Sequence, residues 1–167
     1  GFRPIVIERG SRVEKRTCDV QKFWESGILN PKSNVQFGEG GAGTFSDGKL
    51  NTSVKDPSGR NRLVLETFVR FGADPSILYD NKPHIGTDVL SEVIVNMREF
   101  LVDKGATFVF DTCVNNLDIV SQKLLSVYTD SDSNSNSEIK TDVCVLALGH
   151  SARDTFEMLE REKFLMQ

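Results

Sequence analysis

The spacing of apolar residues along the chain predicts strands that alternate with helices. A short apolar run within Arg3–Gly10 ends in a charged residue and then a glycine, a pattern typical of a buried strand. The next stretch, Ser11–Gly27, predicts a helix, because Ser11 and Glu14 have the spacing of a capping box and a glycine stands at the end. The apolar side of this helix is expected to hold Val13, Cys18 and Trp24.

Two further helices are predicted in the middle of the chain. One covers Ser58–Phe71 and is closed by Gly72. The other has Thr87 as its cap and stops at Gly105, and it carries the most regular helical pattern in the sequence. Its apolar positions are Val89, Leu90, Val93, Ile94, Met97, Phe100 and Leu101.

After Gly105 the apolar period changes from helical spacing to two, which predicts strands. The four segments are Ala106–Thr112, Val114–Val120, Leu124–Thr129 and Ile139–His150. Within the last segment, Val143–Gly149 is continuously apolar, as expected for a central strand covered on both faces. The polar run Ser131–Glu138 predicts a mobile hairpin tip. A closing helix is expected with Ser151 as its cap and Asp154 in its first turn.

Composition and charge exclude several classes of protein. The length of 167 residues suits one domain, and 38% hydrophobic with 26% charged residues is typical of a globular protein. The net charge is −4 and the lysines and arginines are dispersed, so we expect no nucleic-acid partner. Three cysteines without a CxxC motif and only two histidines argue against a zinc site, and we expect no metal.

The same residues bear on where the protein works. No apolar run approaches the roughly 20 residues that a membrane-spanning helix needs, so we expect no membrane span. The odd number of cysteines favours a reducing compartment, and we predict a cytoplasmic location. The chain opens on Gly1 without a methionine, so we expect a piece of a longer protein. A plastid or mitochondrial location stays open, because any presequence would lie upstream.

The stretch Asn34–Asn51 concentrates five glycines, which calls for an explanation. Glycine weakens helices and strands, so a cluster marks an unusual backbone path or a close approach to a bound group. The segment Gly38–Gly43 could cradle a phosphate or lie flat against a planar ring. It is not a phosphate-binding P-loop, because Gly48 and Lys49 are followed by Leu50. The flanking Phe37, Phe45 and Leu50 are expected to be buried, which disfavours a flexible surface loop.

Two other positions suggest a nucleotide site. Glu8 follows the first predicted strand, where an acidic residue of nucleotide-binding α/β folds accepts hydrogen bonds from ribose hydroxyls. The junction Val143–Ala152 passes from a strand through glycine into a helix, which directs backbone N–H groups toward a ligand. The alternatives are a solvated strand end for Glu8 and an ordinary turn for the junction.

Four long stretches of the sequence resemble the uncharacterised FAD-dependent dehydrogenases of the glutathione-reductase-like flavoprotein superfamily. They are PIVIERG, FWESGILNPKSNVQFGEGGAGTFSDGKLN, KPHIGTDVL and VLALGHSARDTFEML. The resemblance implies an α/β fold, namely part of a Rossmann-like FAD-binding domain, a parallel sheet with flanking helices, with an inserted antiparallel β-meander. Residues 1–167 would be its central part, and residues 52–86 would contribute to a substrate or cap region.

The resemblance also assigns roles to residues. Glu8 would hold the adenosine ribose, with Arg9 and Gly10 beside it, and Val114 would meet adenine through its backbone. The glycines near the diphosphate, ribityl chain or flavin ring would be Gly38, Gly40, Gly41 and Gly43. The final cofactor-contacting turn would include Ala147, Gly149 and His150. The family's first strand and its GxGxxG loop are missing from the sequence, so we expect this chain alone to bind FAD poorly.

The function implied is that of a flavin-dependent oxidoreductase acting on an unidentified small molecule, with NAD(P)H as a candidate electron donor. The candidate catalytic residues are Ser46, Asp47, Lys49 and His84. A lysine near the flavin could stabilise a reduced anionic ring, and a histidine could move a proton near neutral pH. Alternatively, Lys49 and Asp47 form a surface pair and His84 belongs to a turn.

Two other functions stay open. One is a non-catalytic module that binds FAD or another adenine nucleotide as a structural or sensing ligand. The other is a cofactor-free fragment that associates with itself into a homo-oligomer, because the open apolar edge of the first strand invites pairing.

Overall fold

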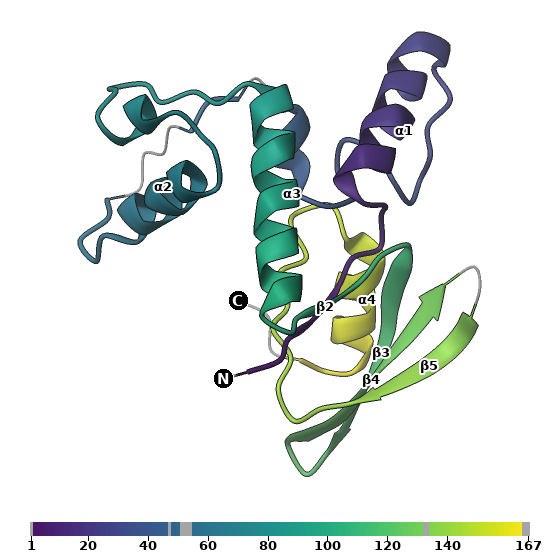
Figure 1. Ribbon diagram of the computed structural model, residues 1–167. Coiled ribbons are helices and arrows are strands. Elements are labelled where there is room, and N and C mark those ends of the chain that lie inside the picture. Colours follow the sequence, from purple (N-terminus) through teal and green to yellow (C-terminus); the bar gives the residue numbers. More distant parts are fainter. Residues whose placement is uncertain (1, 47, 51–54, 132–133, 165–167) are drawn as a thin grey trace.

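The structure, a computed structural model, is a mixed α/β protein in which two small sheets are flanked by helices (Figure 1). It describes residues 2–46, 48–50, 55–131 and 134–164. The elements in chain order are β1 (Ile5–Ile7), α1 (Val13–Ser26), the 3-10 turn η1 (Ala42–Phe45), α2 (Arg60–Arg70), the 3-10 turn η2 (Pro75–Leu78), α3 (Thr87–Asp103), β2 (Thr107–Val109), β3 (Thr112–Val120), β4 (Lys123–Ser131), β5 (Asn134–Lys140) and α4 (Arg153–Arg161).

The two sheets differ in direction. Strands β1 and β2 are parallel, with Ile5 opposite Thr107. Strands β3, β4 and β5 follow one another antiparallel, which confirms the predicted antiparallel meander. The backbone N–H of Thr112 donates to the carbonyl of Glu8, so the start of the meander lies at the carboxyl end of β1. A parallel pair with a meander beside it is therefore established, while a Rossmann-like fold stays a prediction.

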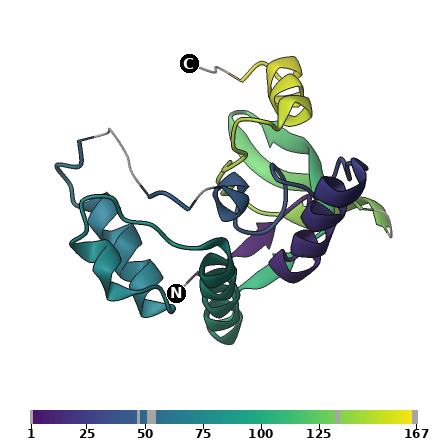
Figure 2. The same ribbon diagram turned by 90° about the horizontal axis from the view of Figure 1, so that it is seen from above.

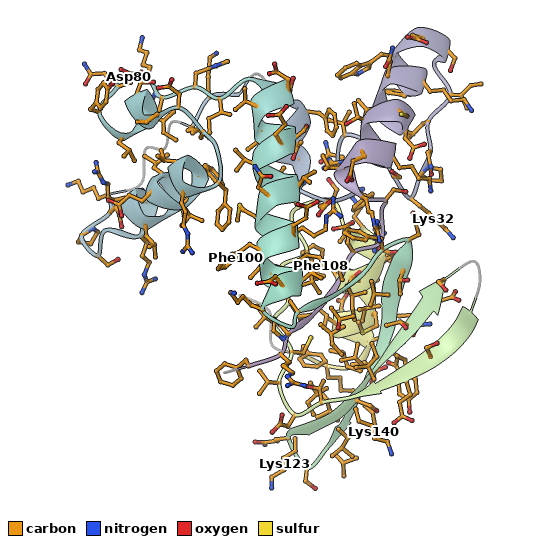
Figure 3. The ribbon with its side chains drawn as sticks, in the orientation of Figure 1. Lys32, Asp80, Phe100, Phe108, Lys123 and Lys140 are labelled. Carbon is orange, nitrogen blue, oxygen red and sulfur yellow. The ribbon has the colours of Figure 1, made fainter. Side chains whose placement is uncertain are left out.

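Helices α1 and α3 stand side by side, and α2 with η2 lies on the other side of α3 (Figure 2). One core cluster joins α2, η2 and α3, and its buried members are Ala73, Ile77, Ile85, Leu90 and Val93. A second cluster joins α4 to the meander through Leu117, Val127, Met158 and Leu159. Phe100 and Phe108 lie on opposite sides of the lower part of α3, and Lys123 and Lys140 mark the end of the meander away from the helices (Figure 3).

Helix α1 was predicted at the right place, but the prediction of its cap was wrong. Gly27 ends the helix in the left-handed conformation, as expected. Ser11, however, donates its hydroxyl to the carboxylate of Asp111, and the free N–H of Val13 donates to Glu39 Oε2 at 2.8 Å. A carboxylate 26 residues away replaces the local capping box, which no local pattern could indicate.

The buried side of α1 also differs from the prediction. Val13 is buried as expected, but Cys18 is exposed and Trp24 is 63% exposed. The side chains that α1 buries are Val13, Arg16 and Val20. The buried residues are spaced by three and four along the helix, whereas the predicted set was spaced by five and six and left out Arg16 and Val20.

The other helices begin close to the predicted residues. Helix α2 starts at Arg60 rather than Ser58, because the Asp56 carboxylate accepts hydrogen bonds from the N–H groups of Arg60 and Asn61. Thr87 is the first residue of α3 rather than its cap, and Gly105 follows the helix with a φ of +93°. Ser151 does not cap α4, since its hydroxyl donates to the amide oxygen of Gln36 instead.

The predicted central strand Val143–Gly149 is wrong. Residues 141–150 form no strand, and Val143 and Val145 are 70% and 84% exposed. A continuous apolar run is a buried strand only where neighbouring strands cover it, and no strand of the described residues pairs with this one.

Strand β1 was also predicted to be buried, yet Ile5 is 49% exposed. Within the described part of the chain, β1 has a partner along one edge, β2, so its side chains lack a second neighbour.

The polar run Ser131–Glu138 was predicted to be a hairpin tip, and most of it is strand. Strand β4 runs to Ser131 and β5 begins at Asn134, with these two residues opposite each other. Ser137 and Glu138 pair with Thr129 and Tyr128. The cross-strand ladder continues through polar residues because backbone groups form it. Positions 132–133, the rest of the predicted tip, lie outside the described residues.

Candidate functional site

The carboxyl end of β1 carries an organised carboxylate rather than a solvated one. Glu8 is half-buried, and its Oε1 accepts hydrogen bonds from the N–H groups of Gly10 at 2.8 Å and Gly38 at 3.0 Å. No hydrogen bond formed among the described residues uses the other carboxylate oxygen. The glycine-rich stretch therefore folds back onto the strand end, 30 residues away in sequence, and leaves one acceptor of Glu8 available.

Arg9 ties this strand end to α4. Its guanidinium donates to Asp154 Oδ1 at 2.8 Å and to the hydroxyl of Thr155 at 3.2 Å, and it lies 4.5 Å from the centre of the Phe37 ring. The hydrogen bond from Arg9 lowers the pKa of Asp154. These contacts bring the first turn of α4 next to the glycine-rich stretch.

Arg16 is the most buried charged residue of the site, and sequence reasoning missed it. Its side chain is fully buried, and its guanidinium donates to five backbone carbonyls at 2.6–3.1 Å. These carbonyls belong to Asn34, Val35, Gly38, Glu39 and Gly41. Loss of water lowers the pKa of Arg16 to about 10, although the charges of Glu8 and Glu39 oppose this shift. A signal existed: Arg16 lies three residues after Val13 and four before Val20, on the apolar face of α1.

Three glycines of the site are required by the protein's own packing. A Cβ on Gly10 would lie 2.6 Å from the Cα of Gly38, and one on Gly38 would collide with the Arg16 side chain. A Cβ on Gly40 would collide with the hydroxyl of Thr44 and with Ile94. Gly41 and Gly43 instead border open space. From the sequence, all of these glycines were expected to make room for a bound group. In the structure, only Gly41 and Gly43 of these five border space that a bound group could fill.

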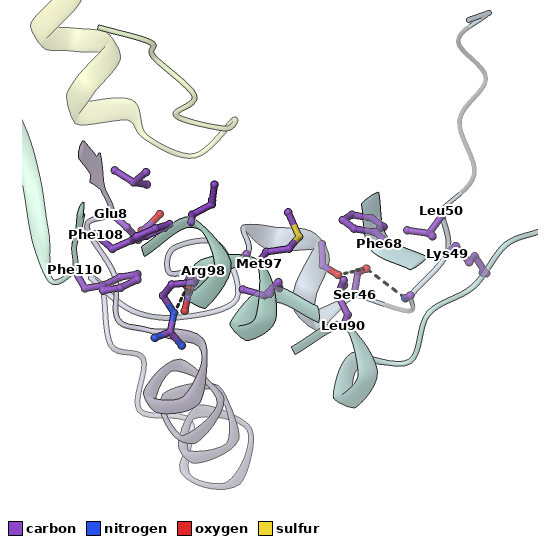
Figure 4. Close-up of a pocket in the computed structure, with 17 residues that line it drawn as sticks. Glu8, Ser46, Lys49, Leu50, Phe68, Leu90, Met97, Arg98, Phe108 and Phe110 are labelled. Atoms are coloured by element: carbon purple, nitrogen blue, oxygen red, sulfur yellow. Dashed lines mark hydrogen bonds and ion pairs between the residues drawn. The ribbon is translucent and has the colours of Figure 1, made fainter. Parts of the chain in front are cut away.

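A cavity of about 450 Å³ lies between the glycine-rich stretch, α3 and the β1–β2 pair (Figure 4). Five of the predicted site residues line it, namely Glu8, Gly40, Gly43, Ser46 and Lys49. Most of its other lining is apolar and includes Phe68, Leu90, Ile94, Met97, Phe108 and Phe110. A groove of this size with a few polar groups is typical of a binding site for a small molecule or for an apolar segment.

An ion-pair network closes one wall of the cavity. Arg98 Nε lies 2.8 Å from Glu39 Oε1, and its terminal nitrogen donates to Glu14 at 2.6 Å. Burial raises the pKa of Glu39, although the N–H of Val13 and the charge of Arg98 oppose this shift. Both charges of the Arg98–Glu39 pair are largely buried, so this network fixes α1, α3 and the glycine-rich stretch against one another.

Of the candidate catalytic residues, Ser46 and Lys49 meet at the cavity. Ser46 is exposed at the cavity, where its hydroxyl donates to the carbonyl of Gly43 at 2.8 Å. Lys49 lines the cavity, and its backbone forms an antiparallel bridge with His84. His84 is exposed and does not line the cavity that the described residues form. Asp47 lies outside the described residues.

The remaining predicted contacts lie apart from the cavity. Val114 is half-buried at a bulge in β3 and packs against the meander core. Ala147, Gly149 and His150 belong to the exposed segment before α4. The hydroxyl of the adjoining Ser151 donates to Gln36 at 3.0 Å, so the end of this segment contacts the glycine-rich stretch.

The groups present fit FAD. The cofactor offers ribose hydroxyls, which need an acceptor, and a diphosphate, which needs donors. Glu8 has a carboxylate oxygen that takes part in no hydrogen bond of the described residues, and the same holds for the backbone N–H groups of Gly40, Ala42 and Gly43. One acceptor and several outward donors at the carboxyl end of a parallel strand meet both needs.

Comparison with known proteins shows that the chain is similar to one part of a longer protein. It is 46% identical over 166 residues to an uncharacterised protein of Clostridium beijerinckii. The match covers 99% of this chain and 30% of that protein, so the chain spans about a third of its relative's length. No family model matches the chain. None of the helices that the structure describes is both long and apolar enough to cross a bilayer.

Proposed function

We propose that this chain is the FAD-binding part of a flavin-dependent oxidoreductase with a Rossmann-like domain. The observation that carries the proposal is the contact of Glu8 with the N–H groups of Gly10 and Gly38. It couples an acidic strand end to the glycine-rich stretch, the two features that the resemblance assigns to the cofactor. The three free cysteines suit the reducing, cytoplasmic location that we propose with it.

Each part of the chain has a role in this proposal. The available oxygen of Glu8 accepts hydrogen bonds from the adenosine ribose, and the N–H groups of Gly40, Ala42 and Gly43 bind the diphosphate. FAD supplies the electron transfer when bound. Lys49 places a positive charge at the cavity, and Ser46 places a hydroxyl there, where they orient a substrate and stabilise developing negative charge.

The test is a spectrum of the complete protein in which this sequence occurs. We expect a yellow protein whose flavin absorbance is bleached by NADH or NADPH under anaerobic conditions. If the protein is yellow but is bleached by neither nicotinamide cofactor nor by a panel of small reduced substrates, it is a non-catalytic FAD-binding module. A protein that stays colourless after incubation with FAD and gel filtration would overturn the proposal.

A further inference from the structure

We propose that Arg16 is the positioning residue that turns the glycine-rich stretch into an anion-binding surface of main-chain N–H groups. The anion class is a phosphate or diphosphate. Its assignment to FAD rests on the proposed function, whereas the surface itself follows from the geometry of the peptide groups.

In a planar trans peptide group, the carbonyl and the following N–H point in opposite directions. Arg16 draws the carbonyl of Glu39 inward at 2.6 Å and that of Gly41 inward at 2.9 Å. The N–H groups of Gly40 and Ala42 must therefore point away from the buried guanidinium. Both residues are exposed, and no hydrogen bond among the described residues uses either N–H.

The contacts of Arg16 also orient the dipoles of the peptide groups around it. The negative ends of five peptide groups are gathered around a buried cation, and the positive ends of two of them, the N–H groups of Gly40 and Ala42, face outward. The two outward N–H groups flank Gly41, whose own N–H donates to the carbonyl of Gly38 at 3.1 Å. Outward main-chain N–H groups that lie this close together in the chain favour an anion between them. The Glu39 carboxylate does not oppose this field at the surface, because it is turned inward to the N–H of Val13 and to Arg98.

Only arginine can perform this task at this position. Its guanidinium carries five N–H donors in a rigid fork, and Nε, Nη1 and Nη2 all donate here. A lysine has three donors on a single nitrogen and cannot reach carbonyls spread over Asn34 to Gly41. The missing side chain of Gly38 gives the arginine its room, so these two residues form one unit.

A buried hydroxyl beside Gly40 supports the inference independently. The hydroxyl of Thr44 is fully buried, lies against Gly40, and has no hydrogen-bond partner among the residues that the structure describes. A buried hydroxyl without a partner costs free energy, so its presence beside the outward N–H of Gly40 is consistent with a polar ligand at this point.

The experiment uses the complete protein with the substitutions Arg16→Lys and Arg16→Met. The controls Arg12→Lys and Arg12→Met change a neighbouring arginine of the same helix end, which is exposed and lies over the Phe110 ring. Circular dichroism and thermal unfolding establish which variants are folded. Binding is measured for FAD, for ADP and for adenosine, which lacks the phosphates.

We expect the wild type to bind ADP at least tenfold more tightly than adenosine. Folded Arg16 variants should lose most of this ratio and bind FAD at least tenfold more weakly, while the Arg12 variants stay within twofold. Should a folded Arg16→Lys variant keep wild-type affinity for FAD and ADP, the inference fails while the proposed function stands. A wild type that prefers ADP over adenosine in an Arg16-dependent way but holds no FAD supports the inference and contradicts the proposed function. Equal affinity for ADP and adenosine contradicts the inference.

A second substitution covers the case in which every Arg16 variant unfolds. Ala42→Pro removes one outward N–H at the first position of η1, where proline is tolerated and Gly41 already has an extended ψ of −175°. Ala42→Ser is its control, because it keeps the N–H. We expect Ala42→Pro alone to lower the ADP-to-adenosine ratio by fivefold or more, and an unchanged ratio would count against the inference.

Discussion

At the residue scale, the two carboxylate oxygens of Glu8 differ in their contacts. Oε1 accepts from the N–H groups of Gly10 and Gly38, and the other oxygen, which takes part in no hydrogen bond of the described residues, is the acceptor that we propose for a ribose. We expect Glu8→Ala in the complete protein to weaken FAD binding by about 1–3 kcal/mol, the usual cost of leaving polar groups unpaired. Fluorescence titration measures the dissociation constant. Glu8→Gln is the matched control, since it keeps an acceptor and should lose less; equal constants for wild type and Glu8→Ala would return Glu8 to an ordinary strand end.

A substitution at Gly41 tests the proposed contact between the glycine-rich stretch and FAD. Its φ of +69° with an extended ψ costs any other residue about 1–3 kcal/mol, and a new side chain would enter open space rather than the protein. We therefore expect Gly41→Val to lower FAD occupancy sharply with little change in far-UV circular dichroism. Gly59→Val is the control, because Gly59 has a φ of +70° and open space but lies before α2. Full flavin content in Gly41→Val would contradict the proposed contact.

The residue scale also marks what a sequence can and cannot predict. Glu8 was singled out because strand ends carry a known chemistry, and the glycine-rich stretch because clustered glycines mark an unusual backbone path. The structure joins the two, and their role in cofactor binding stays a prediction. Arg16 was missed since a charged residue on an apolar helix face is ordinarily counted as solvated. Its partners are backbone carbonyls of residues 34–41, and no sequence pattern encodes carbonyl direction.

At the scale of elements, Glu39 serves as the cap of α1 in place of Ser11. Glu39→Ala removes the acceptor of the Val13 N–H and leaves Arg98 without its buried partner, so we expect a loss of about 2–4 kcal/mol in the free energy of unfolding. Urea unfolding measures it. Glu14→Ala removes the exposed partner of the same arginine and should cost about 1 kcal/mol or less. Similar losses for the two variants would contradict the capping role.

The Arg9–Asp154 pair joins β1 to α4 and predicts a pH dependence. The pKa of Asp154 is lowered in the folded protein by the hydrogen bond from Arg9, so its contribution to stability is present above the unfolded pKa of about 3.9. That contribution is lost as the pH falls through the lowered folded value. We expect Asp154→Asn to melt below the wild type at pH 7, with the difference shrinking below about pH 3.5. A difference in melting temperature that is the same at pH 7 and pH 3 would contradict the ion pair.

Among the elements, those with local signals were predicted and those with distant partners were not. Helix α3 has its period and its terminal Gly105 in one continuous stretch, and the meander has its alternation and short connections. The segment Val143–Gly149 has the composition of a central strand, yet a strand exists only through neighbours. None of the described strands pairs with it, so the composition alone gave the wrong result.

At the scale of the whole molecule, apolar surface remains open where strands lack partners. Val143 and Val145 before α4 are among the most exposed apolar residues, and Ile5 of β1 is about half exposed. The wall of the cavity along α3 is apolar as well. Exposed strand edges and apolar patches favour association between chains. The relative from Clostridium beijerinckii is more than three times as long as the matched part, which leaves ample chain there to cover such surfaces.

We therefore expect the 167-residue chain, expressed alone, to form dimers or larger species in light scattering and to purify without yellow colour. Under the proposed function, the outward N–H groups of the glycine-rich stretch would hold one face of a diphosphate, and a GxGxxG loop of the kind found in the flavoproteins that the sequence resembles would supply the opposite face. The double substitution Val143→Lys with Val145→Lys places charge on exposed positions and should shift the population toward monomer with unchanged circular dichroism. A monomeric wild-type chain that retains one FAD per molecule would contradict both parts of this prediction, because the exposed edge would then be harmless and the cofactor would need no further donors.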